Sequence, residues 1–374
     1  MSWEPKGLDE LGFVSRGRSR HRPRDAAHLY GGPHPFVQTG DVKHAGLYLT
    51  EYTQTYSEEG LAQSRMWPAG TLCITIAANI ADTAILGLDA CFPDSVIGFI
   101  PDENKADARF IKYLFDTLLQ RKYKQFTQGA AQDNLSQAKL LSLQFPIPGI
   151  TEQKKIADVV SAYDDLIENN RRRIQLLEQA ARLLYKEWFV HLRFPGHEHT
   201  RIIDGVPEGW EKKPLGAIAP LKYGKALKND DRVPGPFPVY GSSGIVGTHT
   251  KALVPGPTII VGRKGNVGSV YWSPDDCHPI DTVYYIDSEL CSFFLYYALQ
   301  QMTFISTDVA VPGLNRDFAH SRSILVADQK ILRLFEETVS PLHQQMELLK
   351  RQNASLVKAR DLLLPKLMNG EVVV

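Results

Sequence analysis

The sequence predicts an α+β fold: two repeated, mixed α/β globules separated by two long helices that form an antiparallel coiled coil with pseudo-two-fold symmetry. The first observation behind this prediction is an internal match between residues 68–96 and 255–283. The second is a pair of long segments with helical periodicity, one after each matched segment. The third is a series of short strand-like runs bounded by Gly- and Pro-rich turns in both halves. With 374 residues, the chain is long enough to bury more than one core.

The internal match has a constant shift of 187 residues and six identities in 29 positions, which chance alone could nearly produce. Independent support comes from the residues that follow each copy. Glu152-Gln-Lys and Asp328-Gln-Lys each open a helical pattern, and both patterns later read Leu-x-x-Ala-x-x-Leu-Leu. The identities are Pro68/Pro255, Thr71/Thr258, Asn79/Asn266, Asp89/Asp276, Asp94/Asp281 and Val96/Val283.

The first helical segment has apolar residues that alternate in spacings of four and three, which is typical of a coiled-coil seam. Asn170 interrupts this seam with an amide and is expected to fix the register at some expense of stability, so that Asn170→Leu should raise thermal stability or permit altered assembly. Thr151 is the expected N-cap. The seam positions are Ile156, Val160, Tyr163, Ile167, Asn170, Ile174, Leu177, Ala181, Leu184 and Trp188.

The second helical segment has the same period, and Asp328 is its expected N-cap. Every second position of its seam is more polar than in the first segment. Pro341 lies inside it and should kink or loosen it, because proline lacks a backbone donor. Either the two helices pair with each other, or each packs on its own globule. The expected seam positions are Ile331, Phe335, Thr338, Leu342, Gln345, Leu349, Gln352, Leu356, Ala359 and Leu363.

These patterns give the following domain boundaries. The first globule spans 1–150, the first long helix 151–195, a linker 196–206, the second globule 207–327, the second long helix 328–370 and a tail 371–374.

Composition excludes several classes of protein. Apolar residues make up 43% and charged residues 22%, so the chain should fold as a globular protein. Lys and Arg (42) balance Asp and Glu (42), so a nucleic-acid surface would have to be a local patch. The four cysteines lack the spacing of a zinc site and are expected to be reduced, buried thiols. We expect no membrane partner and a cytoplasmic location, because no signal-like or membrane-spanning segment is found.

Catalytic motifs are missing. The sequence has no GxxxxGK[ST], HExxH, GxSxG or GxGxxG. His197 and His199 alone are an improbable metal site, and the Glu211-x-Lys213 triplet with Asp204 is of a kind that arises often by chance. We therefore predict a chain that is not an enzyme.

Local charge is more informative than catalytic motifs. Arginines occupy every second position of residues 16–24, and an extended segment would point all five to one side, although Pro23 disfavours an ideal strand. The second half has its own basic run at 212–228, followed by Arg263 and Lys264 on a Gly-rich loop. Solvated surface explains either cluster alone, but one cluster per repeat favours nucleic acid.

The sequence resembles the specificity subunits of type I restriction-modification systems. The resemblance covers essentially the whole chain. It is carried most specifically by the segments that flank the helices: Phe-Pro-Ile-Pro at 145–148 before Thr-Glu-Gln-Lys at 151–154, Pro-Glu-Gly-Trp at 207–210, and Leu-Leu-Pro-Lys-Leu-Met-Asn-Gly-Glu at 363–371. Looser similarities lie within the globules, at 31–37, 240–244 and 261–268.

The resemblance implies that each globule is a target-recognition domain for one half of a bipartite double-stranded DNA target, and that the helices set the spacing and dock two methylation subunits. Restriction subunits would join through the complex. This chain would bind no cofactor itself, with S-adenosylmethionine, ATP and Mg expected on the partner subunits.

Base reading needs side chains that reach the groove edges, Arg or Lys for guanine and Asn or Gln for adenine, while other cationic contacts only position the protein. Rival hypotheses are a non-catalytic coiled-coil scaffold or adaptor without DNA specificity, and a stand-alone nuclease or methyltransferase. The candidate DNA-binding residues are Arg16, Arg18, Arg20, Lys43, Lys222, Lys225, Lys228, Ser242, Ser243, Arg263, Lys264 and Asn266.

Overall fold

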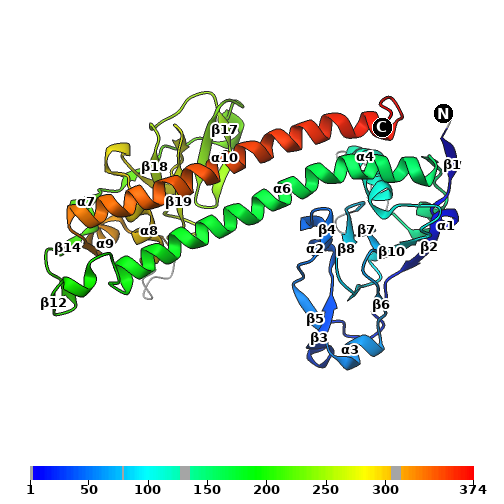
Figure 1. Ribbon diagram of the computed structural model, residues 1–374, viewed down its shortest axis with the longest axis horizontal. Helices are drawn as coiled ribbons and strands as arrows, with labels where there is room; N and C mark the ends of the chain where they lie inside the picture. Colours follow the sequence, from blue (N-terminus) through cyan, green and yellow to red (C-terminus); the bar gives the residue numbers. More distant parts are fainter. Residues whose placement is uncertain (1–2, 78–79, 127–134, 305–312) are drawn as a thin grey trace. The chain divides into compact units, whose positions relative to one another are not determined.

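The computed structural model describes residues 3–77, 80–126, 135–304 and 313–374 (Figure 1). The chain divides into two compact units. Unit 1 comprises Met1–Arg172 and Leu349–Val374, and unit 2 comprises Arg173–Leu348. Each unit therefore contains a globule and a segment of each long helix. No helix in the described ranges is long and apolar enough to cross a bilayer.

Unit 1 contains a five-stranded sheet in the order β2-β10-β7-β8-β4, a four-stranded sheet in the order β5-β3-β9-β6, and the antiparallel pair β1-β11. The strands are β1 (Glu4–Lys6), β2 (Gly12–Arg16), β3 (Tyr30–Phe36), β4 (Tyr48–Leu49), β5 (Gln54–Tyr56), β6 (Met66–Trp67), β7 (Leu72–Thr75), β8 (Thr83–Leu86), β9 (Ala90–Cys91), β10 (Val96–Pro101) and β11 (Phe145–Ile147). The helices of the globule are α1 (Leu8–Leu11), α2 (Thr39–His44), α3 (Glu58–Ala62), α4 (Ala108–Phe126) and α5 (Gln137–Leu141).

Unit 2 contains a four-stranded sheet in the order β15-β21-β18-β19, a three-stranded sheet in the order β17-β16-β20, and the pairs β12-β13 and β14-β22. The strands are β12 (Ile202–Ile203), β13 (Val206–Pro207), β14 (Glu211–Pro214), β15 (Lys222–Tyr223), β16 (Phe237–Gly241), β17 (Gly244–His249), β18 (Thr258–Gly262), β19 (Val270–Ser273), β20 (His278–Pro279), β21 (Val283–Ile286) and β22 (Ser323–Val326). Its short helices are α7 (Leu215–Ile218), α8 (Phe293–Gln301) and α9 (Arg316–Ser321).

The main sheets of the two units have the same strand register. In unit 1, Leu72 pairs with Ile85 and Val96 pairs with Thr75. Adding 187 to each number gives the pairs of unit 2, Ile259 with Trp272 and Val283 with Gly262. The shift that relates the two sequence segments therefore also relates β7, β8 and β10 to β18, β19 and β21.

The two long helices are α6 (Ile150–Tyr185) and α10 (Gln329–Met368), and α6 continues into a π-helical turn, Lys186–Val190. In unit 1, Asn170 bonds to Asn353 and Asp164 bonds to Arg360. In unit 2, the ring centroid of Phe335 lies 6.1 Å from that of Tyr185 and 5.7 Å from that of Trp188. In unit 1 the partner in α10 changes from Arg360 to Asn353 as the residue in α6 changes from Asp164 to Asn170, so the residue numbers run in opposite directions. The helix segments therefore lie side by side and antiparallel within each unit (Figure 1).

Apolar residues of both helices extend the cores of their units. Ile156, Val160 and Leu367 are buried in the core of unit 1 together with Phe110 of α4. Tyr185, Phe335 and Val339 are buried in the core of unit 2. Amphipathic helices are stabilised mainly by such packing, so each helix segment belongs to the fold of its unit.

The expected polar layers of α10 are displaced by one residue. Thr338, Gln352 and Ala359 are exposed. The residues directly after them, Val339, Asn353 and Arg360, are buried or partly buried. A mixed spacing of three and four leaves such a layer ambiguous by one residue, because 3.6 residues make a turn.

Two further expectations need correction. Pro341 is exposed, and α10 runs through it without a break. Thr151 lies inside the first turn of α6, where the amides of Glu152 and Gln153 donate to the Gly149 carbonyl. At the second helix the expected N-cap is confirmed, because Asp328 Oδ1 accepts hydrogen bonds from the amides of Lys330 and Ile331 at 2.9 and 3.0 Å.

Candidate nucleic-acid interface

The arginine-rich segment of unit 1 does not form one cationic face. Strand β2 ends at Arg16, and the following residues turn through a cis Arg22–Pro23 peptide. Arg22 donates to the carbonyls of Ser19 and His21 at 2.9 and 2.7 Å, so it serves its own loop. The expectation that alternation places all five guanidinium groups on one side is therefore wrong, because the segment is not an extended strand.

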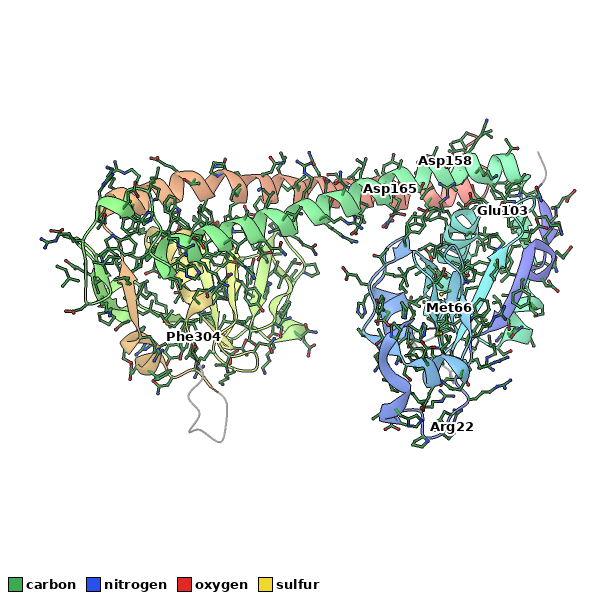
Figure 2. All side chains as sticks on the ribbon, turned by 60° about the horizontal axis from the view of Figure 1, so that its bottom comes forward. Arg22, Met66, Glu103, Asp158, Asp165 and Phe304 are labelled. Carbon is green, nitrogen blue, oxygen red and sulfur yellow. The ribbon has the colours of Figure 1, made fainter. Side chains whose placement is uncertain are left out.

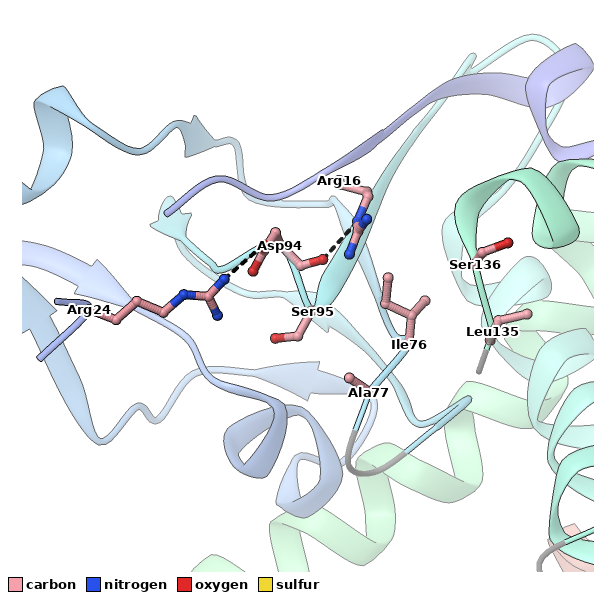
Figure 3. Close-up of a pocket in the computed structure, with 8 residues that line it drawn as sticks. All are labelled: Arg16, Arg24, Ile76, Ala77, Asp94, Ser95, Leu135 and Ser136. Atoms are coloured by element: carbon pink, nitrogen blue, oxygen red, sulfur yellow. Dashed lines mark hydrogen bonds and ion pairs between the residues drawn. The ribbon is translucent and has the colours of Figure 1, made fainter. Parts of the chain in front are cut away.

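Arg16 and Arg24 converge on a single residue, Asp94. Arg16 Nε donates to the Asp94 carbonyl at 2.8 Å, and Arg24 Nη2 forms an ion pair with Asp94 Oδ2 at 2.9 Å. Figure 3 shows both contacts at the mouth of a pocket of about 290 Å³. Its other lining residues are Ile76, Ala77, Ser95, Leu135 and Ser136.

The other candidate DNA-binding residues of unit 1 are Arg18, Arg20 and Lys43. Their backbones are hydrogen-bonded or helical, and their side chains are exposed. The amide of Arg18 donates to the Phe92 carbonyl at 3.0 Å, and the amide of Arg20 donates to Gln63 Oε1 at 2.6 Å. Lys43 is exposed in the last turn of α2. In Figure 2, Arg22 lies on the side of unit 1 that is remote from Asp158 and Asp165 of α6.

Two candidate loops of unit 2 contact each other. Asn266, between β18 and β19, donates from Nδ2 to Ser243 Oγ at 3.2 Å. Ser243 belongs to the turn between β16 and β17, where the Ser242 carbonyl accepts from Ser269 Oγ at 2.7 Å and from Tyr271 Oη at 3.1 Å. The fold thus brings the candidates Ser242, Ser243 and Asn266 together.

Glycine makes this loop approach possible. Gly265 has a φ of +77°, and a Cβ at this position would lie 3.0 Å from Ser242 Oγ. Gly268 has a φ of +79°, and a Cβ there would lie 3.1 Å from Phe304 Cβ. Both glycines adopt the left-handed conformation that other residues rarely adopt. Phe304 lies on the side of unit 2 that is remote from the two helices (Figure 2).

Arg263 stands on one side of this loop and is fixed by two kinds of contact. Its Nη1 donates to the Asp281 carbonyl at 3.1 Å. Its guanidinium carbon lies 4.9 Å from the centroid of the Tyr223 ring and 5.8 Å from that of Tyr284. Cation–π contacts of this kind attract the guanidinium electrostatically and hold it over the ring face.

Tyr223 and Arg316 complete this cluster, although neither is a sequence-based candidate. The Arg316 guanidinium carbon lies 5.1 Å from the centroid of the Tyr223 ring. Tyr223 is 48% exposed. In the described part of the chain, neither Arg263 nor Arg316 forms an ion pair with a carboxylate. The sequence signal for Tyr223 was its place between the candidates Lys222 and Lys225, whereas Arg316 is distant in sequence and had none.

The lysine candidates of unit 2 differ in their contacts. Lys222 forms a 2.6 Å ion pair with Asp287, which raises the pKa of the Lys222 ammonium group. Lys225 and Lys228 are exposed, and their side chains have no hydrogen-bond or ion-pair partner among the described residues. Lys264 is exposed beside Gly313, with which its backbone forms a β-bridge. Lys222 is thus already neutralised, whereas Lys225 and Lys228 are available to an external anion.

One candidate residue of each unit occupies an equivalent position in the fold. The amide of Gly17 donates to the Val96 carbonyl, and the amide of Gly224 donates to the Val283 carbonyl. The next residues repeat the relationship, since Arg18 bonds to the Phe92 carbonyl and Lys225 bonds to the Pro279 carbonyl. Both acceptors are again 187 residues apart, so Arg18 and Lys225 are structural equivalents.

The predicted seam positions differ in burial. In α6, Ile156, Val160, Ile167 and Asn170 are buried, whereas Tyr163, Ile174, Leu177 and Leu184 are half-buried. In α10, Leu349 is buried and Leu342, Leu356 and Leu363 are half-buried. Asn170, 6% exposed, bonds to Asn353, a residue that sequence periodicity placed outside the seam.

The described residues contain no group of three or more His, Cys, Asp or Glu side chains that could hold a metal ion. His197 instead bonds through Nδ1 to the Phe194 carbonyl at 2.9 Å. Asn79, the repeat partner of Asn266, lies outside the described residues.

Comparisons with known proteins give consistent matches. Residues 2–179 and 207–320 match the model of the type I restriction modification DNA specificity domain. The chain is 25% identical to the type I restriction enzyme MjaIX specificity subunit of Methanocaldococcus jannaschii, over 99% of this chain and 93% of that protein. It is 23% identical to the HindI specificity subunit of Haemophilus influenzae, over 97% and 98% of the two chains.

A solved structure has a similar fold. The type I restriction-modification S subunit from M. genitalium aligns with a TM-score of 0.62 at 18% identity, covering 98% of this chain and 96% of that one. At this identity the likeness concerns the fold alone.

Proposed function

Because the chain belongs to the type I restriction modification DNA specificity family, whose members are non-catalytic subunits for DNA target recognition, we propose that its two units read the two halves of a bipartite target. The observation that carries this proposal is the repeated strand register, in which each unit presents one exposed basic residue, Arg18 or Lys225, at an equivalent position. Two equivalent surfaces suit two separate half-sites on double-stranded DNA.

The chemistry of both surfaces supports DNA as the ligand. Exposed cations at Arg18 and Lys225 can neutralise phosphates, which supplies affinity but no sequence preference. Arginine, serine and asparagine side chains on the neighbouring loops can reach base edges. A scaffold without DNA specificity would have no use for these equivalent surfaces, so it is not favoured.

The helices α6 and α10 would set the spacing between the half-sites and dock two methylation subunits. An α-helix of 36 residues, the length of α6, extends about 54 Å, more than the ~34 to 36 Å between half-sites one turn apart. Restriction subunits would join through the assembled complex. S-adenosylmethionine, ATP and Mg would bind to these partners and not to this chain.

The test is to co-express the full chain with candidate methylation subunits and purify the complex. Adenine methylation would be measured on a duplex library that contains two randomised segments separated by variable spacers. We expect methylation to require this chain and to select one split sequence with one spacer. Methylation that is unchanged without the chain, or selection of one continuous sequence, would refute the proposal.

A further inference from the structure

Two arginines from different sequence positions bond to the same backbone position in the two units. Asp94 and Asp281 are equivalent, because each lies two residues before the equivalent valines Val96 and Val283. The Asp94 carbonyl accepts from Arg16, whereas the Asp281 carbonyl accepts from Arg263. The common feature of the two units is therefore a guanidinium group fixed at this carbonyl.

The two arginines come from different elements. Arg16 pairs with Ile97 at the end of β2, and the equivalent residue of unit 2 is Tyr223, which pairs with Tyr284. Arg263 follows β18 and donates its amide to the Thr282 carbonyl. Its equivalent in unit 1 is Ile76, which donates to the Ser95 carbonyl. The arginine thus comes from β2 in unit 1 and from the loop after β18 in unit 2, yet both side chains bond to equivalent carbonyls. A purely solvated arginine would not require this.

Each fixed arginine keeps a pair of donors for a ligand. A guanidinium group has five N–H donors in a planar fork. Arg16 uses only Nε, so both terminal amino groups remain. Figure 3 shows the Arg16 side chain among the residues that line the pocket. Arg263 donates from Nη1 to the Asp281 carbonyl and interacts with the Tyr284 hydroxyl, which leaves further N–H donors of its fork for a ligand. Neither is neutralised by a carboxylate within the described ranges, in contrast to Arg24, which pairs with Asp94.

We propose that Arg16 and Arg263 are equivalent guanine-reading residues, one for each half-site. This inference rests on the proposed function of the two units. A planar fork with two free donors matches the O6 and N7 acceptors of guanine in the major groove. A guanidinium already fixed by its neighbours loses less conformational freedom on binding, which favours discrimination. Flexible cations such as Lys225 are better suited to phosphates.

The experiment is selection of bound duplexes from a library with a randomised split site, using the full chain and the variants Arg16→Lys and Arg263→Lys. Lysine keeps the charge but loses the fork. We expect each variant to lose preference for guanine at one position of one half-site, by about 5- to 150-fold. Arg16→Lys and Arg263→Lys should affect different half-sites, with the other preferences unchanged.

Matched controls are Lys105→Arg in unit 1 and Arg193→Lys in unit 2, whose side chains pair with Asp102 and Glu187. These variants should retain every base preference. Arg16→Gln and Arg263→Gln, made alongside, should also lose guanine, and a thermal midpoint equal to that of the wild type shows that each variant is folded.

The outcomes separate the inference from the proposed function. If the wild-type chain selects no split sequence, the proposed function fails and the inference with it. If the wild type selects a split sequence but the lysine and glutamine variants weaken binding equally at all sequences, the arginines contact phosphates and the inference alone is wrong. Loss of the same base in both variants would also overturn it.

Discussion

Asn170 Nδ2 donates a 2.9 Å hydrogen bond to Oδ1 of Asn353, which joins α6 to α10 within unit 1. Asn353 Nδ2 in turn donates to the Ile167 carbonyl at 3.2 Å. Each amide therefore has a partner on the opposite helix. A polar pair among apolar neighbours is satisfied in one alignment of the helices, and a shift of either helix would leave buried donors without acceptors.

This pairing changes the expected effect of replacing Asn170. Asn170→Leu alone leaves Asn353 Oδ1 without its donor, so we expect a loss of about 1 to 3 kcal/mol in the free energy of unfolding. Asn170→Leu with Asn353→Leu should recover most of that loss, because both polar groups are removed. Denaturant unfolding of both variants measures the difference. Asn169→Leu, at an exposed position, is the control, and a double variant less stable than the single one would contradict the pairing.

Asp164 connects three elements of unit 1. It accepts from Tyr113 Oη of α4 at 2.6 Å and pairs with Arg360 of α10. We expect Asp164→Ala to lower the free energy of unfolding by about 1.5 to 3 kcal/mol, because both partners lose a charged acceptor. The exposed neighbour Asp165 is the control, and Asp165→Ala should stay within about 0.5 kcal/mol of wild type.

A tyrosine titration gives the same substitution a second readout. Burial, followed by the charge of Asp164, raises the pKa of Tyr113. Removing this carboxylate should therefore lower the pKa of Tyr113, so its phenolate absorbance should appear at lower pH in folded Asp164→Ala than in wild type. An unchanged titration would show that Asp164 does not act on Tyr113.

Much of the fold could be predicted from sequence because it depends on local patterns. The 187-residue shift rests on residues in and beside the strands, such as Val96 and Thr71, and the helix pattern rests on apolar spacing. Asn353 and Arg360 could not be assigned, because periodicity does not decide between adjacent polar residues near a seam. The candidate site was harder, since the course of the chain after Arg16 and a stack that joins Arg316 to Tyr223 depend on tertiary packing.

The cysteines should react slowly in the folded protein. Burial raises the pKa of the Cys73 and Cys91 thiols, and raises the pKa of Cys277 and Cys291 to about 11. The thiolate is the reactive form, so little is present at pH 8. We expect a chromogenic disulfide reagent to modify half-buried Cys291 first and the buried thiols only after unfolding. Cys291→Ala should remove the first phase, and rapid modification of all four thiols in the native protein would contradict their burial.

The equivalent residues Arg18 and Lys225 should act as phosphate contacts in the proposed complex with DNA. Both side chains are exposed, and both backbone amides are hydrogen-bonded to carbonyls of their unit. Each phosphate that a protein neutralises contributes about 0.9 to the slope of log affinity against log salt concentration. Arg18→Ala and Lys225→Ala should each reduce that slope by about one unit and weaken binding to all sequences alike. Lys228→Ala should do the same, whereas Lys105→Ala, which removes a lysine paired with Asp102, should leave the slope unchanged. Binding isotherms at several salt concentrations measure these slopes. A change in base preference with an unchanged slope would instead assign Arg18 or Lys225 to base reading.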